Sequence, residues 1–161
     1  MVATANEGSD SIRELLAGHP LFEDFPPRYL DILVGCASNV YFGAGDRIFR
    51  EGEEADRFYL LCDGEVSLEA FSLEHGPLPI QTLRDGDVFG WSWLVPPYRW
   101  RFDAEAQRTT HAIALDGRKL REQCETDPAF GYELLKRLAT LMEQRLQATR
   151  AQLFERAPGH H

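Results

Sequence analysis

The chain is short of the residues that metal and redox sites require. It has three cysteines, Cys36, Cys62 and Cys124, which lie far apart and form no CxxC pair. We interpret them as buried thiols in a reducing compartment. None of the five histidines belongs to an HxH pair followed by a glutamate, the ligand pattern of a metal-dependent β-barrel enzyme. The sequence therefore predicts no metal centre.

Long apolar runs and an excess of positive charge are missing as well. The longest apolar runs, FYLLC and WSWLV, are strand-sized, so no membrane span is expected. The first residues lack the basic and apolar regions of a signal peptide, which favours a cytoplasmic protein. A net charge of -9 argues against DNA as a partner, because phosphate contacts need clustered Lys and Arg. We find no nucleophile–base pair and no paired carboxylates in a credible pocket, and so predict no enzyme activity.

Turn residues predict a single small domain that is mainly β with flanking helices. Short apolar segments alternate with turns rich in Gly and Asp. The turn Gly45-Asp46 before Ile48 is echoed by Gly86-Asp87 before Phe89. Regularly spaced short strands of this kind predict a β-roll or barrel that closes on itself. Strands are expected at 47–50, 57–62, 66–70, 78–83, 99–107 and 110–115.

Helices are expected on both sides of this β region. Ser9 or Asp10 can cap a first helix that ends at Gly18, Pro26-Pro27 begins a second, and Asp116 caps a third. We divide the chain into a tail with a short helix (1–19), a β-roll with flanking helices (20–125), a long helix (126–156) and the remnant of a purification tag (157–161).

The long helix carries the clearest signal in the sequence. Asp127 is a good N-cap, Pro128 suits the first helical position, and no helix breaker follows until Pro158. One apolar stripe, formed by Leu134, Leu138 and Leu141, is suited to covering the roll. A second repeats at steps of four and three, as in the seam of a homodimer. This seam comprises Leu135, Ala139, Met142, Leu146, Thr149 and Leu153. The alternative is one broad stripe buried within the monomer.

Residues 89–106 hold all three tryptophans and two adjacent prolines. Phe89-Gly90 before a short apolar segment and a proline predicts one helical turn that opens at Gly90. The free N–H groups of such a turn are a natural seat for an anion. The candidate ligand-binding residues are Phe89, Gly90, Trp91, Ser92, Trp93, Leu94, Arg99, Arg101, Phe102, Asp103 and Ala104, together with Thr149 on the long helix.

The ordered glycines and aromatic residues resemble a known family. The pattern is Gly45-Asp46-x-Ile48-Phe49, Glu51-Gly52, Asp56, Tyr59-Leu60, Gly64-x-Val66, Gly86-x-x-Phe89-Gly90 and Ala104. It is similar to the cyclic-nucleotide-binding domain of catabolite activator and FNR-like proteins. The resemblance implies a double-stranded β-helix, which is a jelly-roll-like β-roll, with a long C-terminal dimerisation helix. It also implies cAMP or cGMP as a possible ligand. The chain ends a few residues past that helix, so we expect no helix-turn-helix domain.

The cassette that binds the cyclic phosphate departs from the family. There, a Glu after Phe-Gly holds the ribose hydroxyl, and a later Arg, Ser or Thr, and Ala grip the phosphate. Here Trp91 stands at the Glu position. With Ala104 as the family alanine, Phe102 and Asp103 stand at the Arg and hydroxyl positions. We therefore expect weak or lost binding of cAMP and cGMP. Thr149 matches a family Thr that contacts adenine, but we favour its interpretation as a tolerated small residue of the seam.

Strand parity argues that Arg101 does not replace the missing arginine. Ala104 and Ala106 mark the inward face, which places Phe102 in the pocket and Arg101 outside, unless a bulge near Pro96-Pro97 shifts the register. We expect Trp91 and Phe102 to fill the vacated pocket, or else to line a flatter, more apolar one. Arg99 and Arg101 form either a protein-docking patch or ordinary solubilising charge.

Two functions remain open at this point. The first is a non-enzymatic ligand-sensing module with a divergent cassette and a small-molecule ligand. The second is an accessory subunit of a larger protein complex, since one-domain relatives resembling this chain occur in bacterial NAD-linked hydrogenases and other redox assemblies.

Overall fold

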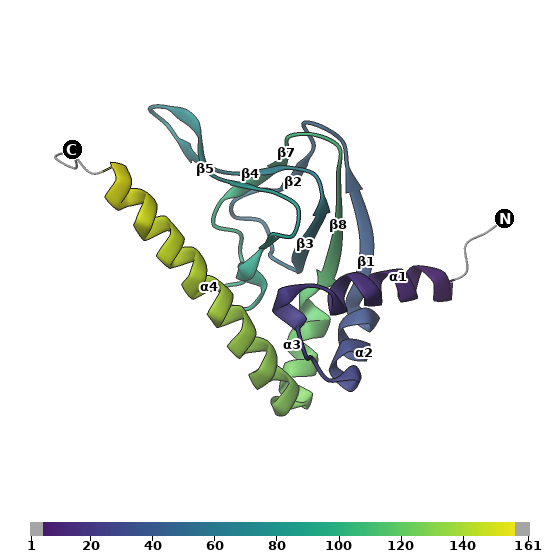
Figure 1. Cartoon of the computed structure of the whole chain (residues 1–161). Helices are drawn as coiled ribbons and strands as arrows, with labels where there is room; N and C mark the ends of the chain where they lie inside the picture. Colours follow the sequence, from purple (N-terminus) through teal and green to yellow (C-terminus); the bar gives the residue numbers. More distant parts are fainter. Residues whose placement is uncertain (1–4, 157–161) are drawn as a thin grey trace.

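The computed structural model describes residues 5–156, with side chains for 11–155, so the remnant expected at 157–161 lies outside the described residues. Eight strands form two antiparallel sheets, in the orders β1-β8-β3-β6 and β2-β7-β4-β5 (Figure 1). The strands are β1 (Ala37–Phe42), β2 (Arg47–Phe49), β3 (Arg57–Asp63), β4 (Val66–Ser72), β5 (Gly76–Leu83), β6 (Val88–Phe89), β7 (Asp103–Ala106) and β8 (Thr110–Asp116). The helices are α1 (Ala5–Ala17), η1 (Pro20–Phe22), α2 (Pro27–Cys36), η2 (Trp91–Trp93), α3 (Gly117–Thr126) and α4 (Pro128–Arg156). The expected β-rich fold with flanking helices and a long last helix is confirmed.

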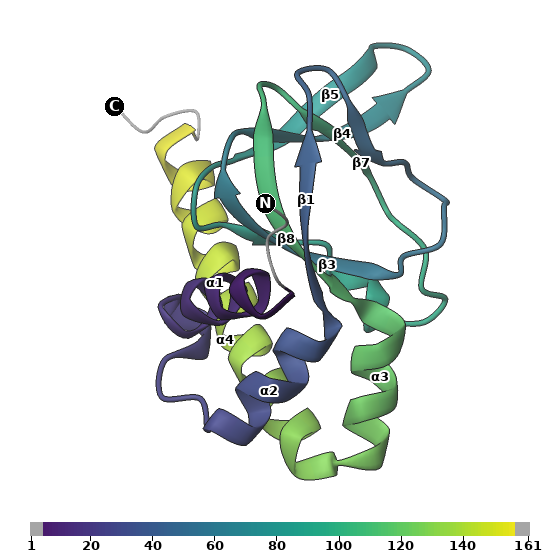
Figure 2. The same ribbon diagram turned by 90° about the vertical axis from the view of Figure 1, so that its right-hand side faces the viewer.

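The sheet β1-β8-β3-β6 separates two hydrophobic cores. Along β3, Tyr59 and Leu61 face the roll interior, whereas Phe58 and Leu60 face the helices. Both sets are buried, because alternate side chains of a strand point to opposite faces. α1, α2 and α3 lie together at one end of the molecule and α4 runs along its outside (Figures 1 and 2).

The two Gly-Asp turns form the same structure. Asp46 Oδ2 accepts the N–H of Gly43 at 2.7 Å, and Asp87 Oδ2 accepts the N–H of Arg84 at 2.8 Å. The glycine before each aspartate has a positive φ, 88° at Gly45 and 89° at Gly86. The echo in the sequence therefore reflects a repeated turn that closes the roll at two places.

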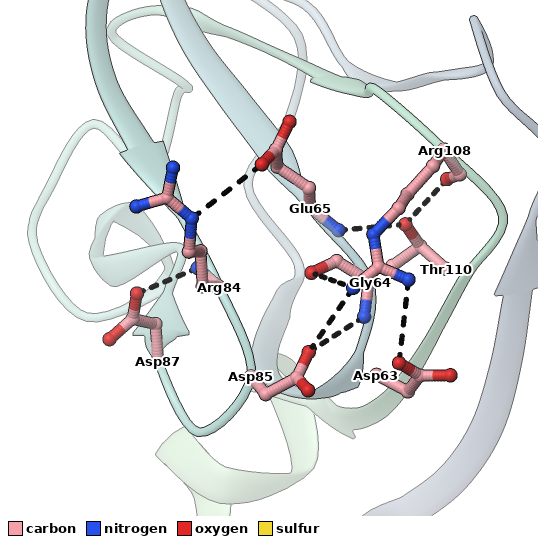
Figure 3. Close-up of polar contacts among 8 residues, drawn as sticks. All are labelled: Asp63, Gly64, Glu65, Arg84, Asp85, Asp87, Arg108 and Thr110. Atoms are coloured by element: carbon pink, nitrogen blue, oxygen red, sulfur yellow. Dashed lines mark hydrogen bonds and ion pairs between the residues drawn. The ribbon is translucent and has the colours of Figure 1, made fainter.

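A polar network joins the second of these turns to the turns at Asp63-Gly64 and at Arg108 (Figure 3). Asp85 Oδ1 accepts the N–H of Gly64 at 2.9 Å, and the Arg108 guanidinium lies 3.5 Å from Asp63 and 3.9 Å from Asp85. Gly64 has φ 146°, and a Cβ there would lie 2.4 Å from Thr110 Oγ1. Only glycine fits this position, which explains the tight Asp63-Gly64 turn.

The helix ends follow the sequence signals. Asp116 accepts the N–H groups of Arg118 and Lys119 at the start of α3, and Asp127 accepts that of Phe130 at the start of α4. Leu134 and Leu138 of α4 are 1% exposed and pack on the helix-side core, as expected of the first apolar stripe. At the other end of the chain, α1 begins at Ala5, earlier than the predicted caps Ser9 and Asp10.

The predicted strand at 99–107 is wrong over its first half, because β7 begins only at Asp103. Pro96 and Pro97 have no backbone N–H for a ladder, and Tyr98 takes a positive φ of 59°. The chain before β7 instead pairs irregularly with the β2–β3 loop. The Trp100 carbonyl accepts the N–H of Gly52 at 2.8 Å, and the Trp100 N–H donates to Glu53 O at 3.0 Å.

Candidate functional site

The turn after β6 has the geometry that the sequence indicated. Gly90, with φ 92°, is the N-cap of η2, and the N–H of Leu94 closes the turn on Trp91 O at 3.1 Å. A Cβ at Gly90 would lie 3.2 Å from Arg57 O and 3.1 Å from the Trp100 ring. Positive φ and close neighbours together require glycine here. Ser92 and Leu94 are half-buried, and Leu94 packs against the helix-side core.

The three tryptophans occupy three different environments. Trp91 is half-buried on the helix side, 5.4 Å from the Phe58 ring. Trp93 is fully buried in the helix-side core, where its Nε1 has no hydrogen-bond partner among the described residues. Trp100 lies inside the roll, stacked on Phe49 with ring centroids 3.8 Å apart and planes at 9°. Residues 91–100 thus contribute tryptophan side chains to both hydrophobic cores.

Aromatic rings fill the roll interior beside Gly90. The Tyr59 ring stacks on Phe89 with centroids 4.9 Å apart, and its centroid lies 6.3 Å from that of Phe49. Phe49 in turn stacks on Trp100. Each of these four side chains is at most 4% exposed. Burial raises the pKa of the Tyr59 hydroxyl, which therefore stays neutral. The interior beside Gly90 is an aromatic stack, and a cavity of about 370 Å³ lies where Phe49, Tyr59 and Trp100 meet the charged side chains of the β2–β3 region, namely Glu53, Glu54, Asp56 and Arg57.

The expectation that Trp91 would fill this interior is wrong, since Trp91 packs against the other side of the sheet. The turn at Gly90 directs the side chain of residue 91 toward α4, and the irregular chain before β7 brings Trp100 inward instead. Phe102 lies half-buried at the edge of the interior, 6.1 Å from Phe49. Phe102 therefore fills part of the interior but does not close it by itself.

Both arginines of the segment lie at the surface. Arg101 is exposed, and Arg99 is exposed with its guanidinium 3.4 Å from Gly52 O. Ala104 and Ala106 are fully buried, so the alternation that the parity argument assumed is present in β7. Asp103 is held on the outer side of the sheet, where it accepts the Glu51 N–H at 2.7 Å and the Arg47 guanidinium at 3.1 Å.

The α4 face next to η2 carries Arg145, a residue to which the sequence analysis assigned no role of its own. The Arg145 guanidinium donates to Val88 O and lies 5.2 Å above the Trp91 ring. Burial lowers the pKa of Arg145, an effect that the charge of Asp87 partly offsets. Thr149, one turn further along α4, is exposed. The sequence signal that could have drawn attention to Arg145 is a cation placed between the two apolar stripes.

The predicted seam lies on the open side of α4. Leu135 is 42% exposed, and Leu146 and Leu153 are each 67% exposed. Ala139 and Thr149 are exposed and Met142 is half-buried. In the monomer, the two stripes are therefore distinct, with one buried and the other facing solvent.

Within residues 5–156 no helix is both long and apolar enough to span a bilayer. Over the same range, no three His, Cys, Asp or Glu side chains are grouped so that they could hold a metal ion.

Comparisons with known proteins agree on one domain type. The model of the cyclic nucleotide-binding domain matches residues 39–127. Human cGMP-dependent protein kinase 2 is 32% identical over 96 residues, which make up 59% of this chain and 13% of the kinase. The CRP-like cAMP-activated global transcriptional regulator of Mycobacterium tuberculosis is 24% identical over 146 residues, 91% of this chain and 65% of the regulator. The chain thus spans less than two thirds of either relative.

The fold recurs in solved structures. A cyclic nucleotide-binding domain from Methylobacillus flagellatus superposes with a TM-score of 0.77 at 20% identity, covering 98% of this chain and 89% of that one.

Proposed function

The chain belongs to the cyclic nucleotide-binding domain family, and on this premise we propose that it is a non-enzymatic regulatory module whose ligand site has diverged from cAMP and cGMP. The proposal rests on the stack of Phe49 and Trp100 against Gly90. In this region the family resemblance places the nucleotide, whereas this chain places two rings in van der Waals contact.

Loss of the polar anchors strengthens the argument. Each hydrogen bond to a charged group contributes roughly 1.5–3 kcal/mol. Trp91 and Phe102 stand where the family has Glu and Arg, so two such anchors are missing. At about 1.4 kcal/mol per decade, binding weakens by roughly a hundredfold to ten-thousandfold. Asp103, at the hydroxyl position, is held on the outer side of the sheet by Arg47 and the Glu51 N–H, so it supplies no hydroxyl to a phosphate.

Calorimetric titration with cAMP and cGMP tests the proposal. We expect no saturable heat below about 1 mM nucleotide for the wild-type chain. The variant Trp100→Ala/Phe102→Arg empties the interior and returns a guanidinium to the family position. It is expected to bind at least about tenfold more tightly than wild type. Micromolar binding by the wild-type chain would refute the proposal.

A protein partner is the second candidate, and the surface around Glu54 favours it. Glu54 pairs with Arg118, and its pKa lies below the usual value through this contact and the nearby charges of Arg99 and Arg121. Arg99, Arg118 and Arg121 place three guanidinium groups around this carboxylate, and Asp56 and Asp116 also lie close to Arg118. Val95, which is 51% exposed, and the exposed Pro96-Pro97 lie in the same loop as Arg99. Such an apolar surface with arginines suits an acidic protein surface.

Affinity capture from the native host tests this candidate. The variant Arg99→Glu/Arg101→Glu is expected to lose a partner that the wild-type chain retains. Arg84→Glu is the control, because Arg84 is exposed and lies in the turn network of Figure 3. A partner kept equally by all three chains would contradict this binding surface.

We also propose that the module is a homodimer through the seam of α4. Exposed leucines repeating every three and four residues support this arrangement, because isolated apolar stripes of this period usually find a second helix.

A further inference from the structure

Two adjoining cavities run along the inner side of α4. The first, of about 190 Å³, lies between α4 and the turn before β6 and is lined by Asp87, Val88, Arg145 and Ala148. The second, of about 210 Å³, continues toward η1 and is lined by Pro20, Leu21 and Thr140. His19, Leu141 and Gln144 line both. Their combined volume lies in the lower part of the size range of small-molecule sites, roughly 300–1,000 Å³.

These cavities are separate from the roll interior. Val88 belongs to the helix-side core, whereas Phe89 points into the roll. Because neighbouring side chains of a strand face opposite sides, a ligand that contacts Val88 cannot occupy the family nucleotide position beside Phe89. A site here is therefore independent of the proposal made above.

Two opposite charges face the first cavity without contacting each other. Arg145 donates to Val88 O, and no carboxylate of the described residues lies within ion-pair distance of its guanidinium. Asp87 uses Oδ2 to accept the Arg84 N–H, which leaves Oδ1 without a partner among the described residues (Figure 3). A desolvated guanidinium has spare N–H donors that need an acceptor.

Of the other polar groups, Gln144 is exposed, whereas His19 and Arg137 are already engaged. His19 accepts the Leu21 N–H through Nδ1 at 3.0 Å and lies 2.6 Å from Gly86 O through Nε2, so both ring nitrogens are used. Arg137 contacts Glu133 at 3.0 Å and Leu21 O at 3.0 Å. The second cavity is thus an apolar arm, formed largely by Pro20, Leu21 and Leu141.

We propose that this groove binds a small zwitterion with an apolar tail, of the class of the aliphatic α-amino acids. The carboxylate lies on Arg145, the ammonium on Asp87, and the side chain extends along Leu141 toward Pro20. A simple organic acid would satisfy Arg145 but would meet the charge of Asp87. A simple amine would do the reverse. A zwitterion satisfies both groups at once.

Calorimetry with three matched probes tests the assignment. L-leucine carries both charged groups, 4-methylpentanoate lacks the ammonium, and 3-methylbutylamine lacks the carboxylate. Leucine is expected to bind saturably with a dissociation constant of about 1 mM or tighter, and the other two at least about tenfold more weakly. No saturation by about 20 mM leucine, or equal binding of leucine and 4-methylpentanoate, overturns the proposal.

Variants assign the two charges separately. Asp87→Asn keeps an oxygen for the Arg84 N–H and is expected to weaken leucine binding at least about tenfold, whereas 4-methylpentanoate should bind this variant more tightly than the wild-type chain because the opposing charge is gone. Arg145→Leu is expected to weaken the binding of both leucine and 4-methylpentanoate. Arg150 is an exposed cation on the same helix outside the groove, so Arg150→Leu should leave both affinities unchanged.

Ala148→Trp blocks the exposed rim and keeps Arg145, so it tests the site even where Arg145→Leu fails to fold. Wild-type affinity for leucine in Ala148→Trp overturns the proposal.

Discussion

At the scale of single residues, the fate of the ligand site depends on where each aromatic side chain points. Trp91 and Trp100 are of the same type and lie nine positions apart in the sequence, yet one faces α4 and the other the roll interior. The family pattern drew attention only to Trp91, which stands at the position of the family glutamate. Trp100 takes the interior because its backbone pairs with the β2–β3 loop, an arrangement that no local sequence pattern specifies.

Replacing Trp100 is expected to destabilise the roll strongly. Trp100→Ala removes a side chain that is 4% exposed and stacked on Phe49, leaving a cavity that the surrounding rings cannot close. Large-to-small aromatic substitutions of this kind cost about 3–5 kcal/mol. Urea unfolding followed by circular dichroism measures the loss. Tyr41→Ala, at a position that is 70% exposed, serves as control and should cost under about 1 kcal/mol. Equal losses in the two variants would rule out a packing role for Trp100.

At the scale of elements, the features that the sequence predicts correctly are the helix caps and turns, which depend on local chemistry. Asp116 and Asp127 cap helices, and glycines mark turns with positive φ, because each depends on its immediate neighbours. The segment before β7 could not be predicted in this way. Its apolar and charged residues alternate like a strand, but Pro96-Pro97 removes ladder donors and the chain finds partners in a distant loop. The groove along α4 is likewise formed by three elements far apart in sequence.

The cap of α4 makes the stability of the fold sensitive to acid. The Arg28 guanidinium, 2.7 Å from Asp127, and the N–H of Phe130 lower the pKa of that carboxyl. A lowered pKa in the folded state stabilises the protein above the unfolded-state value of about 3.9, and this contribution is lost as the pH falls through the folded-state pKa. Asp127→Asn should therefore show a smaller fall in Tm between about pH 5 and pH 2 than the wild-type chain. Glu143→Gln, an exposed position further along α4, should keep the wild-type profile.

The two stripes of α4 are expected to respond differently to truncation. Leu138 is 1% exposed and Leu135 is 42% exposed, although they lie within one turn. Leu138→Ala should lower the free energy of unfolding by about 2–5 kcal/mol, because it leaves a cavity in the helix-side core. Leu135→Ala should cost less than about 1 kcal/mol in the monomer. Chemical denaturation at low protein concentration separates the two, and a larger effect at Leu135 would place the seam within the monomer fold.

At the scale of the whole molecule, α4 must serve three surfaces at once. Its buried stripe covers the helix-side core, Arg145 closes the groove beside β6, and its exposed leucines remain for another helix. A ligand in the groove and a partner on the seam would thus act on one rigid element. On the proposals made above, α4 is the element through which a small molecule in the groove would alter an assembly at the seam.

A single substitution in the seam tests the proposed dimerisation directly. Leu146 is 67% exposed in the monomer, so Leu146→Glu should leave the fold intact and yet place two like charges opposite each other across a two-fold seam. Light scattering coupled to size exclusion should give a dimer for the wild-type chain and a monomer for the variant. Gln147→Glu adds the same charge at the neighbouring exposed position outside the seam and should remain dimeric. A monomeric wild-type chain, or a dimeric Leu146→Glu variant, would show that the exposed leucines of α4 serve another surface.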